Sequence, residues 1–150
     1  MSSSHSSVID TVLLPINSEM KALDAFFEEQ VNTFEPMLRP VFRHCFDHKG
    51  ERLRPIFAFY AARGATERYE MADLVKVAAI IEMIHVATIV HDDVLDQATL
   101  RHKIVTLGAK EGVDVAILFG DTLFAQALCL ASDFPTTDVC RHVSRATRLL

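Results

Sequence analysis

Residues that interrupt helices are scarce in this sequence. Only five glycines and five prolines occur among 150 residues, and no stretch alternates polar and apolar side chains in the way that a β-strand does. Half of the residues are hydrophobic, which is enough for a sizeable core in a chain of this length. The sequence therefore predicts a single all-α domain, without linkers or internal repeats.

Cysteines and runs of basic residues are also scarce. The three cysteines (Cys45, Cys129 and Cys140) do not have the spacing of a metal site, and an odd, scattered set favours reduced thiols over a disulfide scaffold. The formal net charge is −5 and the pI is about 5.8. With lysines and arginines dispersed along the chain, this argues against a nucleic-acid-binding surface. We therefore expect a cytoplasmic protein that binds no nucleic acid.

Signals for export or membrane insertion are lacking as well. The first residues, MSSSHSSVID, have neither a basic start nor an apolar centre, so they do not form a signal peptide. We expect residues 1–14 to be a loose N-terminal segment. The most apolar window, Leu74 to Val90, contains Lys76, Glu82 and His85, which favours a buried helix over a transmembrane segment.

Apolar residues at helical spacing, together with the prolines and glycines, predict six helices. The expected ranges are 17–34, 36–46, 52–63 (ended by Gly64), 71–98, 113–131 and a last helix that begins after Pro135, with a loop over 99–112. The chain stops at RATRLL, inside an amphipathic pattern and without a cap or a glycine. This pattern indicates a truncated domain, of which residues 1–150 are the N-terminal part.

The fourth predicted helix carries an acidic cluster at its C-terminal end. Asp92 and Asp96 are one helical turn apart, so their carboxylates point into the same volume, and the helix macrodipole disfavours negative charge there. A stripe of Glu82, His85, Ile89, Asp92, Asp93 and Asp96 is expected along one face. A divalent cation would compensate this charge. Mg²⁺ suits the site because it binds through one or two carboxylates plus substrate phosphates.

Two other interpretations of the acidic cluster are open. It is either a solvated helix end or one half of an ion pair between Asp96 and Arg101. Arg101, His102 and Lys103 follow shortly after the aspartates, and acidic and basic groups that converge beside an apolar helix fit a magnesium–diphosphate site better than a plain surface.

A second basic cluster lies upstream, in HKGERLRP. Lys49, Arg52 and Arg54 surround Gly50. Arginine side chains bind phosphate oxygens in pairs, and a glycine at a helix start exposes backbone N–H groups to an anion. The alternative is a helix start with ordinary surface arginines.

Together these motifs resemble those of the trans-isoprenyl diphosphate synthase (polyprenyl synthetase) family. The matching segments are GERLRP at 50–55, EMIHVATIVHDDVLD at 82–96, Arg101, and FGDTLFAQAL at 119–128. The resemblance implies a helical bundle of the isoprenoid synthase type around a deep apolar cavity. It also implies that an allylic diphosphate is joined head to tail to isopentenyl diphosphate with the help of Mg²⁺.

The resemblance assigns roles to individual residues. Asp92, Asp93 and Asp96 match the first aspartate-rich motif of the family, whose outer two members hold Mg²⁺ ions that bind the allylic diphosphate and stabilise it as it leaves. We therefore expect Asp92 and Asp96 to be the metal ligands and Asp93 to be secondary. Arg101 matches an arginine that binds the allylic diphosphate.

Binding of isopentenyl diphosphate is assigned to Arg54 and His85, and the sequence departs from the family around them. Glu51 stands where the family has a diphosphate-binding lysine. His102 replaces the second of two arginines and is a weaker anion ligand. A second aspartate-rich motif, which the family has in its C-terminal half, is absent from the 150 residues. We therefore expect the chain to be inactive or very weak by itself.

Product length is predicted from two small residues. Ala87 and Thr88 lie five and four positions before Asp92. In the family, bulky aromatic residues at these places keep the product short. Their absence predicts a long-chain product, of the kind used for quinone side chains. The alternative is that the small residues simply allow close helix packing.

Three functional hypotheses follow. The first is part of a polyprenyl diphosphate synthase, completed by a longer chain or by a second chain, and assembled as a homo-oligomer or with a partner. The second is a non-catalytic regulatory subunit of a heteromeric synthase, although such subunits often lack the aspartate-rich motif that is intact here. The third is a plain α-helical interaction domain.

Overall fold

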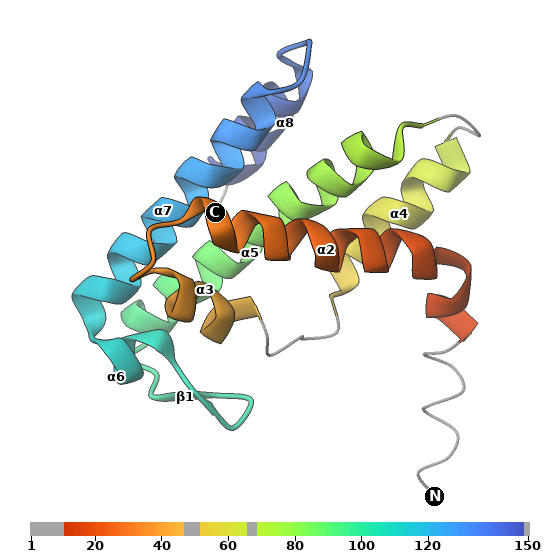
Figure 1. Ribbon diagram of the computed structural model, residues 1–150. Helices are drawn as coiled ribbons and strands as arrows, with labels where there is room; N and C mark the ends of the chain where they lie inside the picture. Colours follow the sequence, from red (N-terminus) through yellow and green to blue (C-terminus); the bar gives the residue numbers. More distant parts are fainter. Residues whose placement is uncertain (1–10, 47–51, 66–68, 149–150) are drawn as a thin grey trace, which may run out of the picture.

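The computed structural model describes residues 11–46, 52–65 and 69–148, which are mostly helical (Figure 1). The helices are η1 (Leu14–Ile16), α2 (Asn17–Thr33), α3 (Arg39–Phe46), α4 (Leu53–Ala65), α5 (Met71–Leu95), α6 (Leu107–Glu111), α7 (Val113–Ser132) and α8 (Asp138–Thr147). Two short strands, β1 (Leu100–Arg101) and β2 (Ile104–Val105), form an antiparallel hairpin. The prediction of an all-α fold is confirmed.

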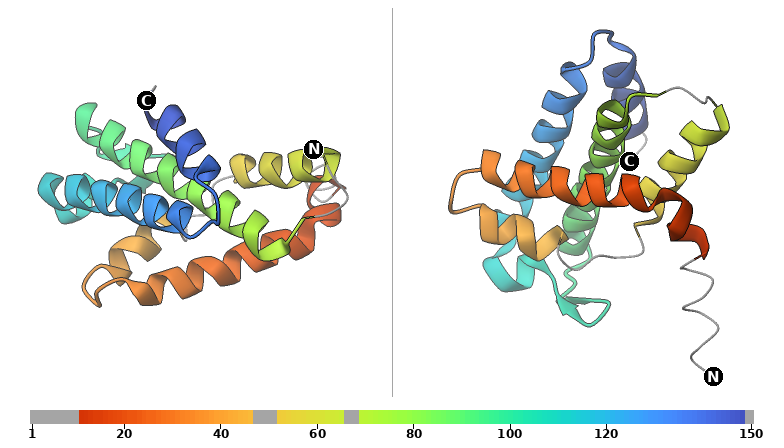
Figure 2. Two further views of the ribbon diagram at one scale, coloured as in Figure 1. Left: turned by 90° about the horizontal axis from the view of Figure 1, so that it is seen from above. Right: turned by 45° about the vertical axis from the view of Figure 1, so that its right-hand side comes forward.

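Helices α5 and α7 form the centre of the bundle. They pack side by side, while α2 crosses α5, and α4 and α8 each lie against α5 as well (Figure 2). Fully buried alanines at the centre allow the two helices to approach closely, and larger buried side chains fill the remaining space. The alanines are Ala78, Ala79, Ala87, Ala116 and Ala127, and the larger residues include Met83, Phe119 and Leu123.

The two central helices are also long and apolar enough to cross a membrane. Met71–Leu95 and Val113–Ser132 both have a window with a mean hydropathy of 1.7, of which 39% is buried within the bundle. Two such helices are weak evidence for a membrane protein, because the core helices of a soluble protein pass the same test. The absence of a transmembrane segment stays a prediction.

A buried polar cluster joins α2 to α4. Glu19 has no exposed surface, and its Oε1 accepts hydrogen bonds from Arg63 Nη2 (2.6 Å), Arg63 Nε (3.0 Å) and the Tyr69 hydroxyl (3.2 Å). The Ser18 hydroxyl donates to the other oxygen at 2.7 Å. Burial raises the pKa of Glu19, but the hydrogen bonds from Ser18, Arg63 and Tyr69 outweigh it, so the net pKa lies below its ordinary value. Both carboxylate oxygens are therefore satisfied.

The described part of the expected loose N-terminal segment is residues 11–14, and residues 1–10 lie outside the described ranges. The Tyr60 hydroxyl donates to the carbonyl oxygen of Val12 at 2.7 Å. This bond attaches the end of the segment to α4.

Three predicted helix boundaries were wrong. The second helix begins at Arg39 and not at Pro36, because residues 35–38 form a turn in which Leu38 N–H donates to Glu35 C=O at 2.9 Å. Gly64 lies inside α4 and does not end it. The long helix α5 ends at Leu95, before the predicted Ala98.

The early end of α5 is fixed by backbone hydrogen bonds. Ala98 N–H donates to Asp93 C=O (2.9 Å) and Gln97 N–H donates to Val94 C=O (3.1 Å), while Gln97 has a φ of +52°. This is the Schellman arrangement, which usually requires glycine at the position of positive φ. The sequence has glutamine there, so the end of the helix carried no recognisable signal.

The predicted loop over 99–112 contains the β1–β2 hairpin and α6. Leu100 pairs with Val105 and Arg101 with Ile104, and the two residues between the strands, His102 and Lys103, have φ values of +50° and +69°. Positive φ at both positions is typical of the tight turns that match the twist of a hairpin. The Thr106 hydroxyl donates to Ala98 C=O (2.6 Å) and accepts from Ala109 N–H (3.3 Å), so it both closes the hairpin and caps α6.

Candidate active site

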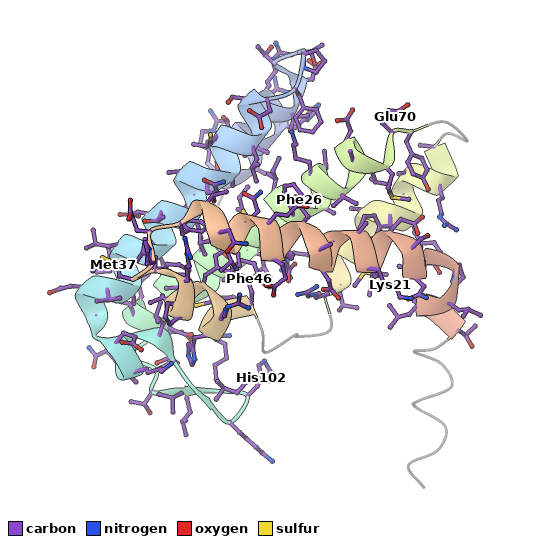
Figure 3. All side chains as sticks on the ribbon, in the orientation of Figure 1. Lys21, Phe26, Met37, Phe46, Glu70 and His102 are labelled. Atoms are coloured by element: carbon purple, nitrogen blue, oxygen red, sulfur yellow. The ribbon has the colours of Figure 1, made fainter. Side chains whose placement is uncertain are left out.

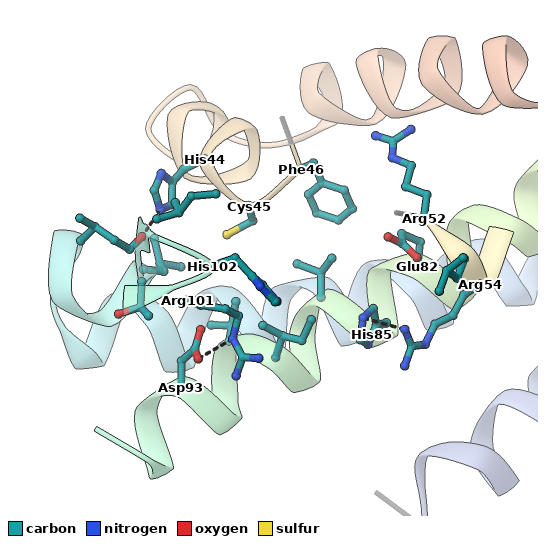
Figure 4. Close-up of a pocket in the computed structure, with 18 residues that line it drawn as sticks. His44, Cys45, Phe46, Arg52, Arg54, Glu82, His85, Asp93, Arg101 and His102 are labelled. Atoms are coloured by element: carbon teal, nitrogen blue, oxygen red, sulfur yellow. Dashed lines mark hydrogen bonds and ion pairs between the residues drawn. The ribbon is translucent and has the colours of Figure 1, made fainter. Parts of the chain in front are cut away.

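A cavity of about 830 Å³ opens between α3, α4, α5 and the hairpin (Figure 4). We call it the polar cavity, because nine charged or titratable side chains line it. These are His44 and Cys45 of α3, Arg52 just before α4, Arg54 of α4, Glu82, His85 and Asp93 of α5, and Arg101 and His102 of the hairpin. The sequence-predicted residues Arg54, His85, Asp93, Arg101 and His102 are thus brought together.

Arg54 and His85 are in direct contact inside this cavity. Arg54 Nη1 lies 2.8 Å from His85 Nε2. A guanidinium can only donate, so this imidazole nitrogen accepts and the ring is neutral. Burial lowers the pKa of His85, and the positive charges of Arg54 and Arg101 lower it further. An exposed guanidinium beside a neutral imidazole is a suitable binding place for an anion.

Arg101 is held by Asp93, not by Asp96. Its Nε lies 2.7 Å from Asp93 Oδ1, and the Asp93 side chain is only 8% exposed. The alternative ion pair between Asp96 and Arg101 is therefore wrong in this structure. The contact joins the hairpin to α5 and directs Arg101 into the polar cavity. His102 extends from the hairpin tip toward the same cavity (Figure 3).

The second basic cluster is divided between two environments. Arg52 forms an ion pair with Asp24 of α2, and its guanidinium lies 5.3 Å from the centre of the Phe27 ring. Its side chain is only 8% exposed, so it borders the cavity but serves mainly to join α4 to α2. The remaining members of the predicted cluster, Lys49 and Gly50, and the family departure at Glu51, lie outside the described residues.

Glu82 is a member of the cavity to which the sequence assigned no role. Its Oε2 is buried and has no hydrogen-bond partner in the described part of the chain. Burial raises the pKa of Glu82, and the nearby charges of Arg52 and Arg54 oppose this rise without cancelling it. No local sequence pattern signals this, because the environment of a glutamate on an apolar helix depends on its neighbours from other helices.

A second cavity, of about 500 Å³, lies between α5 and α8. We call it the apolar cavity, because aliphatic side chains dominate its walls. Its lining comprises Val77, Ile80, Ile81, Ile84, His85 and Thr88 of α5, Asp138, Val139, His142, Val143 and Ala146 of α8, and Arg54 of α4. Arg54 and His85 border both cavities.

The prediction that the three aspartates share one stripe of α5 was wrong. Asp93 is buried and follows Glu82, His85 and Ile89 along the polar cavity, whereas Asp92 and Asp96 are exposed and line neither cavity. The reason is that adjacent residues on an α-helix are about 100° apart. Asp92 lies instead one turn beyond Thr88, at the end of the side of α5 that lines the apolar cavity.

Asp92 and Asp96 are suited to a divalent cation. Neither has an ion-pair partner within the described ranges. Asp92 lies in the last turn of α5, and Asp96 is its C-cap residue, one turn further on. No three His, Cys, Asp or Glu side chains among the described residues are placed to hold a metal ion. Two free carboxylates without a third protein ligand fit Mg²⁺, which keeps several waters and takes further oxygens from a bound phosphate.

The two residues predicted to set product length lie in different places. Thr88 lines the apolar cavity, and its hydroxyl donates to His85 C=O at 2.7 Å. Ala87 is fully buried and borders neither cavity. A larger side chain at position 88 would therefore narrow the apolar cavity, whereas one at position 87 would disturb the core.

His91 and Gly120 form a contact that the sequence did not reveal. A Cβ atom at position 120 would overlap the imidazole ring of His91. His91 Nε2 lies 3.2 Å from Ile117 C=O and 3.6 Å from Asp121 Oδ1, and the ring centre is 5.9 Å from that of Phe124. The segment FGDTLFAQAL thus supports the helix turn that carries Asp92. The segment was recognised from the sequence as part of the family resemblance, but its contact with His91 of α5 was not.

Known proteins resemble this chain over most of its length. Residues 35–150 match the polyprenyl synthetase family. The all-trans-nonaprenyl-diphosphate synthase (geranyl-diphosphate specific) of Rhodobacter capsulatus is 35% identical over 136 residues, which are 91% of this chain and 42% of that protein. The chain therefore spans less than half the length of this curated relative.

Solved structures show the same fold. A decaprenyl diphosphate synthase from Rhodobacter capsulatus superimposes with a TM-score of 0.84 at 29% identity, over 93% of this chain and 43% of that one. A polyprenyl synthase from Caulobacter crescentus, complexed with calcium and isoprenyl diphosphate, also gives a TM-score of 0.84, at 28% identity, over 93% of this chain and 42% of that one. The expected bundle of the isoprenoid synthase type is confirmed, and the chain belongs to the polyprenyl synthetase family.

Proposed function

We propose that this chain provides the part of a magnesium-dependent prenyl diphosphate synthase that carries the first aspartate-rich motif. The enzyme would join isopentenyl diphosphate to an allylic diphosphate and make a long-chain polyprenyl diphosphate. The observation that carries the proposal is the pair of cavities beside α5, one polar and one apolar, with Arg54 and His85 between them. Two substrates with charged heads and apolar tails need such an arrangement.

The polar cavity supplies the groups for isopentenyl diphosphate. Arg54 would bind phosphate oxygens, with neutral His85 as a hydrogen-bond donor through its other ring nitrogen. His102 lies at the opposite edge of the cavity. Its imidazole has fewer hydrogen-bond donors than the guanidinium of an arginine, so it would bind the anion more weakly.

The end of α5 supplies the groups for the allylic diphosphate. Asp92 and Asp96 would hold Mg²⁺, which when bound neutralises the charge of a departing diphosphate. Arg101, fixed by Asp93, would bind the same anion. The apolar cavity begins one turn before Asp92, at Thr88, so it would hold the allylic tail away from water. The small side chain of Thr88 favours a long product.

The sequence contains no second aspartate-rich motif, and the chain covers 42% of its Rhodobacter relative. We therefore propose that catalysis requires further residues, from a longer chain or from a second chain in a homo- or hetero-oligomer. A non-catalytic regulatory subunit of a heteromeric synthase is the alternative. The free carboxylates of Asp92 and Asp96 favour the catalytic role, because a regulatory subunit does not need them.

Calorimetry with an allylic diphosphate, with and without Mg²⁺, tests the proposal. Asp92→Ala with Asp96→Ala should abolish the increase in affinity that Mg²⁺ gives to the parent chain, while the helical circular dichroism is unchanged. A matched control is Asp73→Ala with Glu29→Ala, two exposed acids at the opposite end of α5 and on α2, which should bind like the parent. Equal magnesium-dependent affinity in the Asp92/Asp96 variant would show that the metal assignment is wrong.

A further inference from the structure

One carboxylate oxygen of Glu82, Oε2, in the polar cavity, is buried without a hydrogen-bond partner among the described residues. Glu82 lies on α5 one turn before His85 and beside Arg52 and Arg54 (Figure 4). A buried polar atom without a hydrogen-bond partner is energetically unfavourable. Among the described residues, this oxygen therefore has an unmet need for a hydrogen bond.

The neighbouring arginines are committed elsewhere. Arg52 pairs with Asp24 and lies against Phe27, while Arg54 donates to His85. Neither forms an ion pair with Glu82 in the described structure. This explains why the effect of burial prevails and the pKa of Glu82 is raised in spite of two positive charges nearby.

A diphosphate in this cavity would change the balance of charge. It would bring at least two negative charges close to Glu82, and like charges at short range favour the protonated form of a carboxyl group. Protonation also turns an acceptor into a donor. An ionised Glu82 repels the anion, whereas a protonated Glu82 can donate a hydrogen bond to it.

We propose that Glu82 takes up a proton from solvent when a diphosphate binds beside Arg54 and His85, and that the resulting carboxylic acid donates a hydrogen bond to the bound anion. This inference rests on the proposed diphosphate site. It predicts that affinity falls as the pH rises, by up to about tenfold per pH unit for one linked proton.

Other titratable and charged groups face the same cavity and must be separated from Glu82. They are Arg52 just before α4, Arg54 of α4, His85 and Asp93 of α5, Arg101 and His102 of the hairpin, and His44 and Cys45 of α3. His85 is the main competitor, because its pKa is lowered in the free protein and an anion would raise it. Burial holds the pKa of Cys45 at about 12, so this thiol keeps its proton throughout.

The experiment is calorimetric titration of the 150-residue chain with inorganic diphosphate between pH 5.5 and 8. Each titration is repeated in two buffers of different ionisation enthalpy, which gives the number of protons taken up. The variants are Glu82→Gln, His85→Gln and, as a matched control, Glu29→Gln, which changes an exposed acid on α2. Proton exchange by the diphosphate itself cancels in the differences between variants.

The expected result is that Glu82→Gln takes up fewer protons than the parent when it binds diphosphate. The difference should approach one proton per bound diphosphate at the pH where it is largest. Its amide can still donate a hydrogen bond, so above pH 7 it should bind as tightly as the parent or more tightly. Glu29→Gln should match the parent. The His85→Gln variant should still take up, on binding diphosphate, the proton that we assign to Glu82.

Three outcomes would overturn the inference. Equal proton uptake by the parent and Glu82→Gln would exclude titration of Glu82. Weaker binding by a folded Glu82→Gln over the whole pH range would show that the cavity needs the carboxylate. No binding by the parent would remove the proposed diphosphate site as well, so failure of the site is distinguished from failure of the proton linkage.

Discussion

Glu19 and Glu82 are both acids near arginines, yet their surroundings differ. Glu19 has partners on both oxygens, from Ser18, Arg63 and Tyr69, and its pKa is lowered. Glu82 has one buried oxygen without a partner among the described residues, and its pKa is raised. The first environment is complete without a ligand and holds two helices together. The second is incomplete, which is the condition expected of a binding site.

Removal of Glu19 should have the largest effect on stability. Glu19→Ala leaves Arg63 and Tyr69 without their acceptor, and we expect it to lower the free energy of unfolding by about 3 kcal/mol, the lower end for a broken buried ion pair, because Arg63 is 37% exposed. Urea unfolding measures the change. Glu29→Ala, on the exposed side of the same helix, is the control. A loss below about 1 kcal/mol would mean that the Glu19 cluster is not structural.

Arg63, which pairs with Glu19, and Arg54, which lies beside Glu82, should differ in the same way: the first should matter for stability and the second for binding. Arg63→Gln should lower the free energy of unfolding, by less than Glu19→Ala does, since it removes a charged hydrogen-bond donor from buried Glu19. Arg54→Gln should change stability by less than about 0.5 kcal/mol, because Arg54 is exposed, but should weaken the binding of inorganic diphosphate by about tenfold or more. Equal effects of the two substitutions on binding would break the comparison.

Glu82→Gln should raise stability slightly, and only in one pH range. Because the pKa of Glu82 is raised by folding, its contribution to stability is fully present below about pH 4.5 and is lost as the pH rises through the folded pKa. Glutamine does not ionise. The variant should therefore be more stable than the parent at pH 7, by less than about 1 kcal/mol, and the difference should shrink toward pH 4.5. Thermal unfolding at several pH values gives this difference, and a variant less stable at pH 7 would contradict it.

The hairpin at the edge of the polar cavity should give the smallest effect. Lys103 has a φ of +69°, a conformation that costs a residue with a side chain about 1–2 kcal/mol relative to glycine. Since glycine also loses more backbone entropy on folding, we expect Lys103→Gly to stabilise the chain by about 0.5 kcal/mol. Lys21→Gly, inside α2, is the contrasting control and should destabilise it. Destabilisation by Lys103→Gly would mean that this turn is not strained.

Much of the fold could be predicted from the sequence because its helices are long and strongly periodic. The ranges of α2 and α7 were predicted to within one residue. The hairpin was missed, because strands of two residues have no periodicity and His102–Lys103 is not a typical turn sequence. The end of α5 was missed because Gln97 stands where glycine usually does.

For the site, the residues that gather in the polar cavity were predicted by motif, but their pairings were not. Asp96 is nearer to Arg101 in sequence than Asp93 is, yet the path of the chain after α5 ends at Leu95 brings Arg101 to Asp93. Arg52 pairs with Asp24 only because α2 packs beside the start of α4. The surroundings of the Glu82 carboxyl group likewise depend on residues from other elements. Contacts between helices far apart in the sequence leave no local pattern.

The contact between His91 and Gly120 couples two positions that lie 29 residues apart. The space that a side chain would need at position 120 is already filled by the imidazole ring, so the sizes of these two residues are not independent. In a library that varies both, a larger residue at 120 should be tolerated only together with a smaller one at 91. Engineering of the neighbouring metal ligands, Asp92 and Asp96, therefore has to treat a position on α7 as part of the same design problem.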